Sequence, residues 1–202
     1  MAAGLETATR PFPDARERIL NSAYELFSHR GIRNVGVDEV IERAGVAKAT
    51  LYRHFPAKDD LVLAFLARRE QLWTKDWVEA EARRRGANPE EQLLAIFDLF
   101  DEWFQRDDFE GCSFVNVLLE FGGRDHHALA RASALHLENI RTVVRTFAEE
   151  AGLRDPSSFA LSWHILMKGS IVQSAEGDRE AAKRAQAMAR LLIDKHRTAP
   201  TT

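Results

Sequence analysis

The sequence lacks the features of secreted, disulfide-linked and membrane-spanning proteins. It contains one cysteine, Cys112, among 202 residues, so no disulfide can form within the chain, which favours a reducing compartment. No run of about 18 apolar residues occurs, so no transmembrane helix is predicted. Residues 1–13 show neither the basic start nor the apolar stretch of a signal peptide. These absences predict a cytoplasmic protein that has no membrane partner.

A surplus of basic residues is also absent, which by itself argues against a nucleic-acid partner. The chain has 28 Lys and Arg against 31 Asp and Glu, a net charge of −3, and residues 1–60 contain nine of each sign. The stretch from Arg43 to Lys58 nevertheless contains four basic residues and no acidic one. Because a single basic face is enough to meet phosphates, the local charge is compatible with nucleic-acid binding.

Strand-like alternation and internal repeats are absent as well, and the apolar periodicity is helical throughout. The first helix is predicted to begin at a capping Asp14 and to end at Gly31 in the left-handed conformation. Residues 1–13 are predicted to form a flexible arm. The sequence predicts an all-α protein of about nine helices, over residues 14–30, 37–44, 47–54, 58–85, 88–104, 111–122, 125–150, 156–176 and 179–196.

Two short helices follow the first one in close succession. Gly45 ends the helix over 37–44, and Pro56 follows the helix over 47–54, in which Leu51 is predicted to face inward and Phe55 to close the end. Short helices joined by a tight glycine-containing turn are typical of the helix-turn-helix motif.

The segment from Val37 to Leu61, VDEVIERAGVAKATLYRHFPAKDDL, resembles the DNA-binding segment of the tetracycline-repressor (TetR) family. The shared pattern is an Ala-Gly-Val turn, then Thr-Leu-Tyr-x-His-Phe, then the spacing of Lys58 and Leu61. The likeness extends back through the first helix and covers about 50 residues. It implies a homodimeric bacterial transcription factor with a DNA-binding head at 14–60 and a ligand-binding and dimerisation domain at 61–202. The habit of the family implies a repressor that a ligand releases from a palindromic operator.

The helix over 47–54 provides the candidate DNA contacts. Arginine is the usual reader of guanine, and Arg53 stands where TetR-type proteins vary. We expect base-edge contacts from Arg53, Lys48 and Ala49. Hydroxyl groups, imidazole and ammonium groups suit phosphates, so the remaining candidates are Thr50, Tyr52, His54 and Lys58, with Val37 at the start of the preceding helix. The sequence departs from the family pattern at Gly36 and Ala47, where the family commonly has Ser or Thr, and Ser, respectively.

Aromatic residues at helical spacing dominate the rest of the chain. In TetR-type proteins these helices surround a ligand pocket, and aromatic-lined cavities suit apolar or aromatic molecules. The same spacing is typical of a plain helical core, which is the commoner outcome for any single residue. The candidate ligand-binding residues are Trp73, Trp77, Phe97, Phe100, Phe104, Cys112, Asn116, Trp163, His164 and Met167. Residues 111–121 also resemble a Cys-x-Phe-x-Asn-x-x-x-Glu-Phe segment of some family members.

The resemblance also implies that the last two helices, over about 156–176 and 179–196, form the interface of the homodimer. Small residues there would permit a close approach of helices: Ala181, Ala182, Ala185, Ala187 and Ala189.

No motif supports an enzyme, and neither a cofactor nor a metal site is expected. Catalysis would have to use Cys112, the His126–His127 pair, His136, His164 or Glu120, none of which has a catalytic motif around it. The Glu-x-x-His pairs of a di-iron site are absent. One alternative stays open, a helix-turn-helix protein that a partner controls instead of a small ligand. A fully packed core in residues 60–170 would favour that alternative, and an open cavity would favour the sensor.

Overall fold

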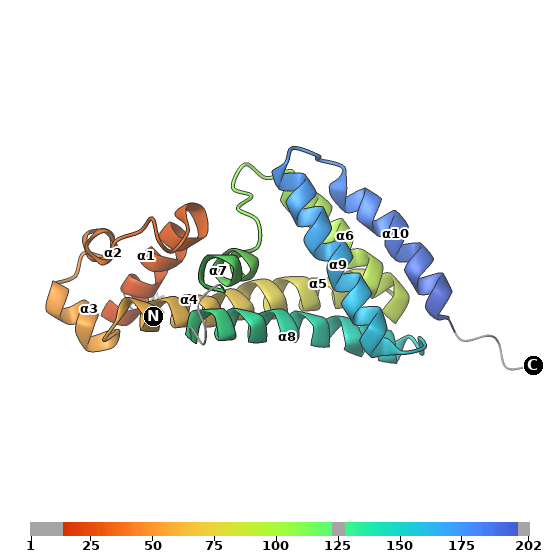
Figure 1. Ribbon diagram of the computed structural model, residues 1–202, viewed down its shortest axis with the longest axis horizontal. Helices are drawn as coiled ribbons and strands as arrows, with labels where there is room; N and C mark the ends of the chain where they lie inside the picture. Colours follow the sequence, from red (N-terminus) through yellow and green to blue (C-terminus); the bar gives the residue numbers. More distant parts are fainter. Residues whose placement is uncertain (1–13, 123–127, 198–202) are drawn as a thin grey trace, which may run out of the picture. The chain divides into compact units, whose positions relative to one another are not determined.

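The computed structural model describes residues 14–122 and 128–197, and the regular structure of these residues is entirely helical (Figure 1). When consecutive helical segments are counted together, the described residues form nine helices, which confirms the predicted fold class and helix count. The predicted arm over 1–13 and the His126–His127 pair lie outside the described residues. Within the described ranges, no helix is both long and apolar enough to cross a membrane.

The chain divides into two compact units between Leu61 and Val62. The first unit contains α1 (Ala15–Arg30), α2 (Val37–Ala44) and α3 (Lys48–His54). The carboxylate of Asp14 caps α1 by accepting a hydrogen bond from the Glu17 backbone N–H at 2.8 Å, as its position predicted. Apolar side chains of all three helices form the core, with Ile19, Ala23, Phe27, Val40, Leu51 and Phe55 buried.

Two glycines end helices of this unit in different ways. Gly45 has φ 61° and ψ 45°, the left-handed conformation that ends α2 and turns the chain tightly into α3. Gly31 has φ 76° but ψ 164°, so its predicted left-handed conformation is wrong. Its N–H still bonds to the Phe27 carbonyl at 3.0 Å, and the chain then leaves α1 in an extended direction that only glycine adopts readily.

A continuous helical stretch over residues 58–85 consists of α4 (Lys58–Arg69), the π-helical segment η1 (Glu70–Glu79) and α5 (Ala80–Arg85). The helical periodicity of the sequence predicted the length of this stretch but not its π-helical segment. In η1, Trp73 and Val78 are buried, whereas Leu72 is 48% exposed. Because a π-turn bonds residues five apart, it shifts the apolar face relative to an ideal α-helix.

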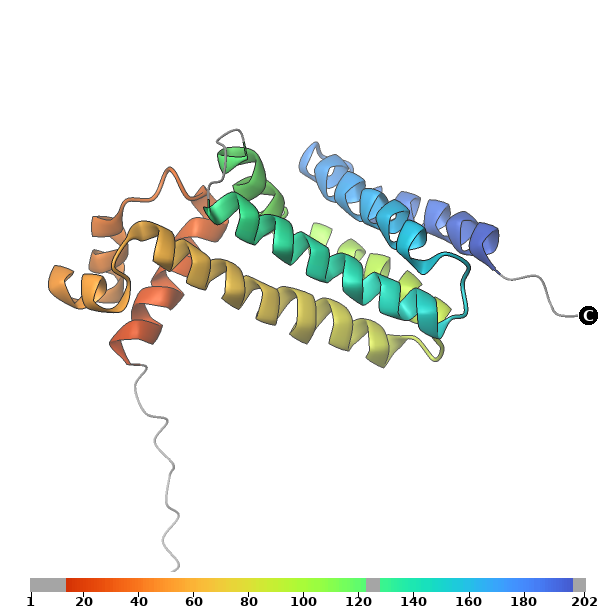
Figure 2. The same cartoon turned by 60° about the horizontal axis from the view of Figure 1, so that its bottom comes forward.

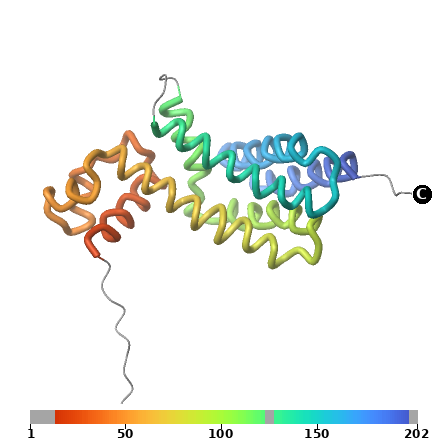
Figure 3. Tube along the Cα trace, turned by 90° about the horizontal axis from the view of Figure 1, so that it is seen from below, coloured from red at the N-terminus to blue at the C-terminus, as the bar shows by residue number. Residues whose placement is uncertain are grey.

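The second unit is built around α6 (Pro89–Phe104) (Figure 2). This helix contacts η1, α5, α8 (Ala128–Glu150), α9 (Pro156–Ala175) and α10 (Ala181–His196). The short α7 (Ser113–Phe121) packs on α8, and α9 lies between α8 and α10 (Figure 3). The side chain of Asn88 caps α6 by accepting a hydrogen bond from the Glu91 N–H at 3.0 Å, and Pro89 occupies the first turn.

Aromatic rings fill the interior of this unit. Phe100 lies 5.8 Å from Trp73, 6.4 Å from Trp77 and 5.7 Å from Trp103, measured between ring centroids. A second chain of contacts joins Phe97 to Trp163 at 5.2 Å. Offset and edge-to-face ring pairs of this kind add about 0.5–1.5 kcal/mol each to the free energy of burial. The rings therefore hold η1, α6 and α9 together.

The alanines of α10 pack within the chain. Ala181, Ala182, Ala185 and Ala189 are buried, and α10 contacts α9 and α6 closely, while Ala187 alone of the five is exposed. Large apolar side chains face outward on the same two helices instead: Leu161, Ile165 and Val172 on α9, and Met188 and Leu191 on α10. The small residues of the last helix thus bring it close to its own neighbours, and the exposed apolar surface comes from larger residues.

The turn between α5 and α6 leaves no room for a side chain at Gly86, so a substitution there should lower the stability of the protein. A Cβ atom at Gly86 would lie 2.3 Å from the backbone nitrogen of Gln92, so we expect Gly86→Ala to destabilise the protein by about 3 kcal/mol. Thermal unfolding should show a decrease in Tm of roughly 6–12 °C. The matched control is Gly36→Ala, where an added Cβ meets nothing within 4 Å and the cost stays below about 1 kcal/mol. Equal Tm values for the two variants would contradict the close approach.

Candidate nucleic-acid interface and ligand pocket

One side of α3 is presented outward by the packing of its other side. Leu51 is 1% exposed and Phe55 is 3% exposed, so these two side chains hold the helix on the core of the first unit. Lys48, Ala49, Tyr52 and Arg53 are exposed, with Tyr52 at 41%, while Val37, Thr50, His54 and Lys58 are half-buried. The structure therefore places every candidate DNA-binding residue in the first unit or at the start of α4, and four of them are exposed.

Two of the basic side chains near α3 form ion pairs with carboxylates of the neighbouring helices, which the sequence alone does not reveal. Lys48 Nζ lies 3.1 Å from Asp38 Oδ1 on α2, and Arg43 pairs with Glu25 on α1. The hydrogen bond from Lys48 to Asp38, together with the charge of that carboxylate, raises the pKa of Lys48. Arg53, in contrast, forms no hydrogen bond or ion pair with any described residue. Because exposed ion pairs are weak and exchange readily for another anion, Lys48 can still meet a phosphate, but Arg53 needs no exchange.

Lys58 binds the backbone of the loop after α1, a structural role that its position in the helix-turn-helix segment did not reveal. Its Nζ donates a hydrogen bond to the Ile32 carbonyl oxygen at 2.6 Å and lies 6.0 Å from the centroid of the Phe27 ring. This ammonium group therefore ties the start of α4 to the loop after α1. No local sequence signal predicts the contact, because 26 residues separate the two partners.

The two departures from the family pattern leave helix ends without side-chain caps. Neither Gly36 at α2 nor Ala47 at α3 makes a side-chain capping hydrogen bond. The first backbone N–H groups of these helices thus have no side-chain partner of that kind. Backbone N–H groups at helix N-termini are suitable donors to phosphate oxygens.

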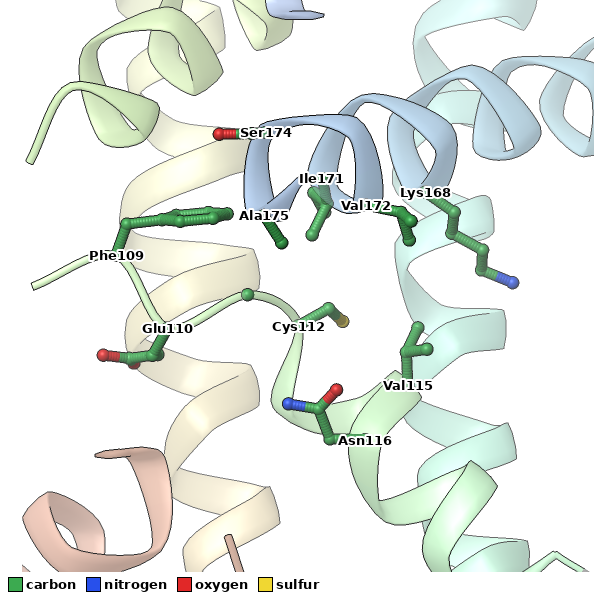
Figure 4. Close-up of a pocket in the computed structure, with 11 residues that line it drawn as sticks. Phe109, Glu110, Cys112, Val115, Asn116, Lys168, Ile171, Val172, Ser174 and Ala175 are labelled. Carbon is green, nitrogen blue, oxygen red and sulfur yellow. The ribbon is translucent and has the colours of Figure 1, made fainter. Parts of the chain in front are cut away.

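The second unit contains a pocket of about 510 Å³ between the α6–α7 loop, α7 and α9 (Figure 4). The loop contributes residues 109–112, and α7 contributes Val115 and Asn116. The wall on α9 is formed by Lys168, Ile171, Val172, Ser174 and Ala175. Of the ten candidate ligand-binding residues, Cys112 and Asn116 line this pocket, and the other eight do not.

Most of the candidate aromatic residues are core residues. Phe97, Phe100 and Trp163 are at most 1% exposed and pack ring against ring, while Trp73, Phe104 and Met167 are buried too and Trp77 is half-buried. The indole N–H groups of Trp73 and Trp163 have no hydrogen-bond acceptor among the described residues. The aromatic residue that does line the pocket is Phe109, which sequence reasoning missed because it lies in a loop. Its ring rests on Trp103 at 4.8 Å and on Phe104 at 5.1 Å.

A buried ion pair joins the pocket wall to α4. Arg69 Nη1 donates to Glu110 Oε1 at 2.5 Å, and the two side chains are 7% and 14% exposed. Glu110 lines the pocket, and Arg69 is the last residue of α4. Buried charges of this kind persist only when both partners stay in place, because removing one of them costs about 3–5 kcal/mol.

The described cysteine and histidine side chains that a catalytic site would have to use are buried or paired with neighbouring side chains. Burial raises the pKa of the Cys112 thiol, so the reactive thiolate is scarce at neutral pH. His136 Nδ1 lies 2.6 Å from Glu70 Oε2, and Phe114 stacks on the imidazole ring. Burial, followed by the charges of Lys168 and Arg141, lowers the pKa of His164 to about 3, so this imidazole is neutral. In the part of the chain that the structure describes, no three His, Cys, Asp or Glu side chains gather as metal ligands would.

Comparison with known proteins places the first unit in a defined family. Residues 19–65 match the family model described as "Bacterial regulatory proteins, tetR family". The helix-turn-helix (HTH) transcriptional activator FasR of Mycolicibacterium smegmatis is 33% identical over 97 residues, and the HTH-type transcriptional repressor KstR of Rhodococcus jostii is 35% identical over 97 residues. These matches cover 48% and 46% of this chain, and 43% and 42% of the relatives, so the chain spans less than half of either relative.

Two longer matches extend into the second unit. The HTH-type transcriptional regulator TtgW of Pseudomonas putida is 33% identical over 128 residues, which cover 63% of this chain and 92% of that protein. Among solved structures, a TetR-family transcriptional regulator of Streptomyces coelicolor is 27% identical and superposes with a TM-score of 0.81 over 90% of this chain and 95% of that chain. The similarity thus extends beyond the first unit into the second.

The hydrogen bond of Lys58 to the Ile32 carbonyl predicts that Lys58 contributes to stability and that Arg53 does not. We expect Lys58→Met to destabilise the first unit by about 1–2 kcal/mol, because the Ile32 carbonyl loses its donor. Arg53→Met, which removes a cation without a partner among the described residues, should change stability by less than about 0.5 kcal/mol. Amide hydrogen exchange of α1 and α2 measures both effects. Equal protection in the two variants would show that the Lys58 contact contributes nothing.

Proposed function

This chain belongs to the TetR family of transcriptional regulators, and on that premise we propose that it is a ligand-controlled repressor that binds a palindromic operator as a homodimer. The family consists of regulators and not of enzymes. The observation that carries the DNA-binding part is the outward face of α3, with its unpaired Arg53. A regulator of chromosomal DNA acts in the cytoplasm, which is the compartment we propose.

Sequence recognition is assigned to α3. An exposed helix of this width fits the major groove, where a guanidinium group reads guanine through two hydrogen bonds. We assign base contacts to Arg53, Lys48 and Ala49. Phosphate contacts are assigned to Tyr52, His54, Thr50 and Lys58, with Val37 and the uncapped start of α2 beside them. In a twofold dimer, the two copies of α3 would enter successive major grooves about 34–36 Å apart.

Dimerisation is assigned to the exposed apolar face of α9 and α10. Ile165 is 70% exposed and Leu191 is 69% exposed, and Leu161 and Met188 are each 57% exposed. Neighbouring helices rarely present so many large apolar side chains to water unless a partner covers them. The interface therefore uses these larger side chains in place of the buried alanines of α10.

Control by a small ligand is supported by the pocket. A cavity of about 510 Å³ is within the size range of small-molecule sites, whereas a regulator controlled only by a partner protein needs no such cavity. The buried Arg69–Glu110 pair connects the pocket wall to α4, which begins with Lys58 in the DNA-binding unit. Repression is proposed from the family habit, since one relative is named a repressor and another an activator.

The recognition role of Arg53 predicts a loss of discrimination. Against duplexes selected from a random pool by the wild-type protein, Arg53→Ala should lower the preference for the selected site by about 1–3 kcal/mol. Tyr52→Phe is the control, because loss of one phosphate donor should weaken binding to all duplexes by about 1 kcal/mol without changing the preference. Fluorescence anisotropy measures both affinities. A uniform loss in both variants would remove Arg53 from the base-reading set.

The proposed interface predicts which substitutions separate the protomers. Ile165→Glu and Leu191→Glu place a charge in the apolar face of α9 and α10, and each should convert the dimer to a monomer in sedimentation velocity. Leu135→Glu on α8 makes the same change at a side chain that is 59% exposed outside that face, and it should leave the dimer intact. Dissociation by the Leu135 variant alone would move the interface to α8.

A further inference from the structure

The charged groups that line the α7–α9 pocket are not balanced. Its carboxylate, Glu110, is neutralised by the buried Arg69. Its ammonium group, Lys168, is half-buried and pairs with no carboxylate among the described residues. The thiol of Cys112 does not supply a negative charge, because burial raises its pKa. The pocket wall therefore has one uncompensated positive charge.

A second cation near Lys168, Arg141, strengthens this imbalance. Burial, followed by the charge of Arg141 on α8, lowers the pKa of Lys168. Arg141 Nη1 also lies 3.4 Å from Nδ1 of His164, whose imidazole is neutral. Arg141 has one carboxylate partner of its own, Glu138, which is half exposed to solvent. A partly dehydrated site with this surplus of positive charge is costly when empty and favours an anion.

The remainder of the pocket is mainly apolar. Figure 4 shows Lys168 at one edge and Phe109 at the opposite edge, with Ile171, Val172 and Ala175 of α9 between them. Val115 lies on the α7 side, close to the Lys168 edge (Figure 4). The arrangement is thus polarised, with a cationic end and an apolar length.

We propose that the ligand of this pocket is an amphipathic organic acid, whose carboxylate pairs with Lys168 and whose apolar body lies along α9 toward Phe109. The inference rests on the proposed ligand-controlled function and adds the chemical class of the ligand. A neutral molecule of the same shape would leave the ammonium group uncompensated, and an amine would add a second positive charge. The amide of Asn116 offers a further polar contact to a substituted body.

Three probes with one apolar body test the class of ligand: decanoate, 1-decanol and decylamine. Isothermal titration calorimetry of the full-length protein should give at least tenfold tighter binding of decanoate than of 1-decanol, with decylamine the weakest. Lys168→Met keeps the length of the side chain but removes its charge, and it should abolish the preference for decanoate. Lys195→Met, an exposed lysine of α10, is the matched control and should retain it.

Stability of the unliganded variant gives a second readout. Lys168→Met removes a partly dehydrated charge, so its Tm should equal or exceed that of the wild-type protein, and a folding defect will not mimic the loss of binding. Equal affinities for decanoate and 1-decanol, a preference that survives in the Lys168 variant, or no binding of any of the three probes would each overturn the proposal.

Operator binding separates this proposal from the one on which it rests. The same samples are titrated with a selected duplex, first without a probe and then with each probe. If the protein binds the duplex and 1-decanol releases it as well as decanoate does, the regulator stands and the acidic class of ligand is wrong. If no duplex is bound in the absence of probes, the proposed function itself fails, whatever the calorimetry shows.

Discussion

The packing of large aromatic rings around α6 is the constraint on which the second unit depends. Phe100 contacts the rings of Trp73, Trp77 and Trp103, and Phe97 contacts Trp163 on α9. The same ring stack supports Phe109 and so positions the loop that forms one wall of the pocket. Two indole N–H groups are left without acceptors among the described residues, at a cost of about 1–3 kcal/mol each. The burial of several large rings readily exceeds that cost, so shape and not hydrogen bonding dominates this core.

Local signals in the sequence predicted local structure well. Asp14, Gly45, Asn88 and Pro89 act within one turn of the chain, and each begins or ends a helix where predicted. The contacts that form the candidate sites are different, because they join residues far apart. Lys58 reaches Ile32 across 26 residues, and Arg69 reaches Glu110 across 41. Helical periodicity identifies an inward face, but it does not distinguish a ring in a packed core from a ring beside a cavity. For that reason Phe97 and Trp163 were candidates for the pocket and Phe109 was not.

The basic side chains near α3 differ in the partners that they have within the first unit. Ion pairs with Asp38 and Glu25 occupy Lys48 and Arg43, and the Ile32 carbonyl accepts a hydrogen bond from Lys58. Arg53, in the last turn of α3, forms no ion pair with a described residue, and its guanidinium group has the geometry to read a base. A cation in an ion pair must leave its carboxylate before it meets a phosphate, so a paired cation adds less to the binding of duplexes of any sequence than a free one. In the proposed repressor, the base contacts of Arg53 therefore add specificity without the loss of an ion pair.

The Arg69–Glu110 pair gives the proposed ligand a direct physical means of acting on α4. A ligand changes the operator affinity only if it binds the two conformations of the regulator with different affinities. In the proposed binding mode, the apolar body of the acid reaches Phe109, whose neighbour in the loop is Glu110, the partner of Arg69. Useful coupling between two sites needs about 1–3 kcal/mol, which is less than the roughly 3–5 kcal/mol at stake in a buried ion pair. In this proposal, a partial loss of the Arg69–Glu110 contact would supply enough free energy to couple the ligand to α4.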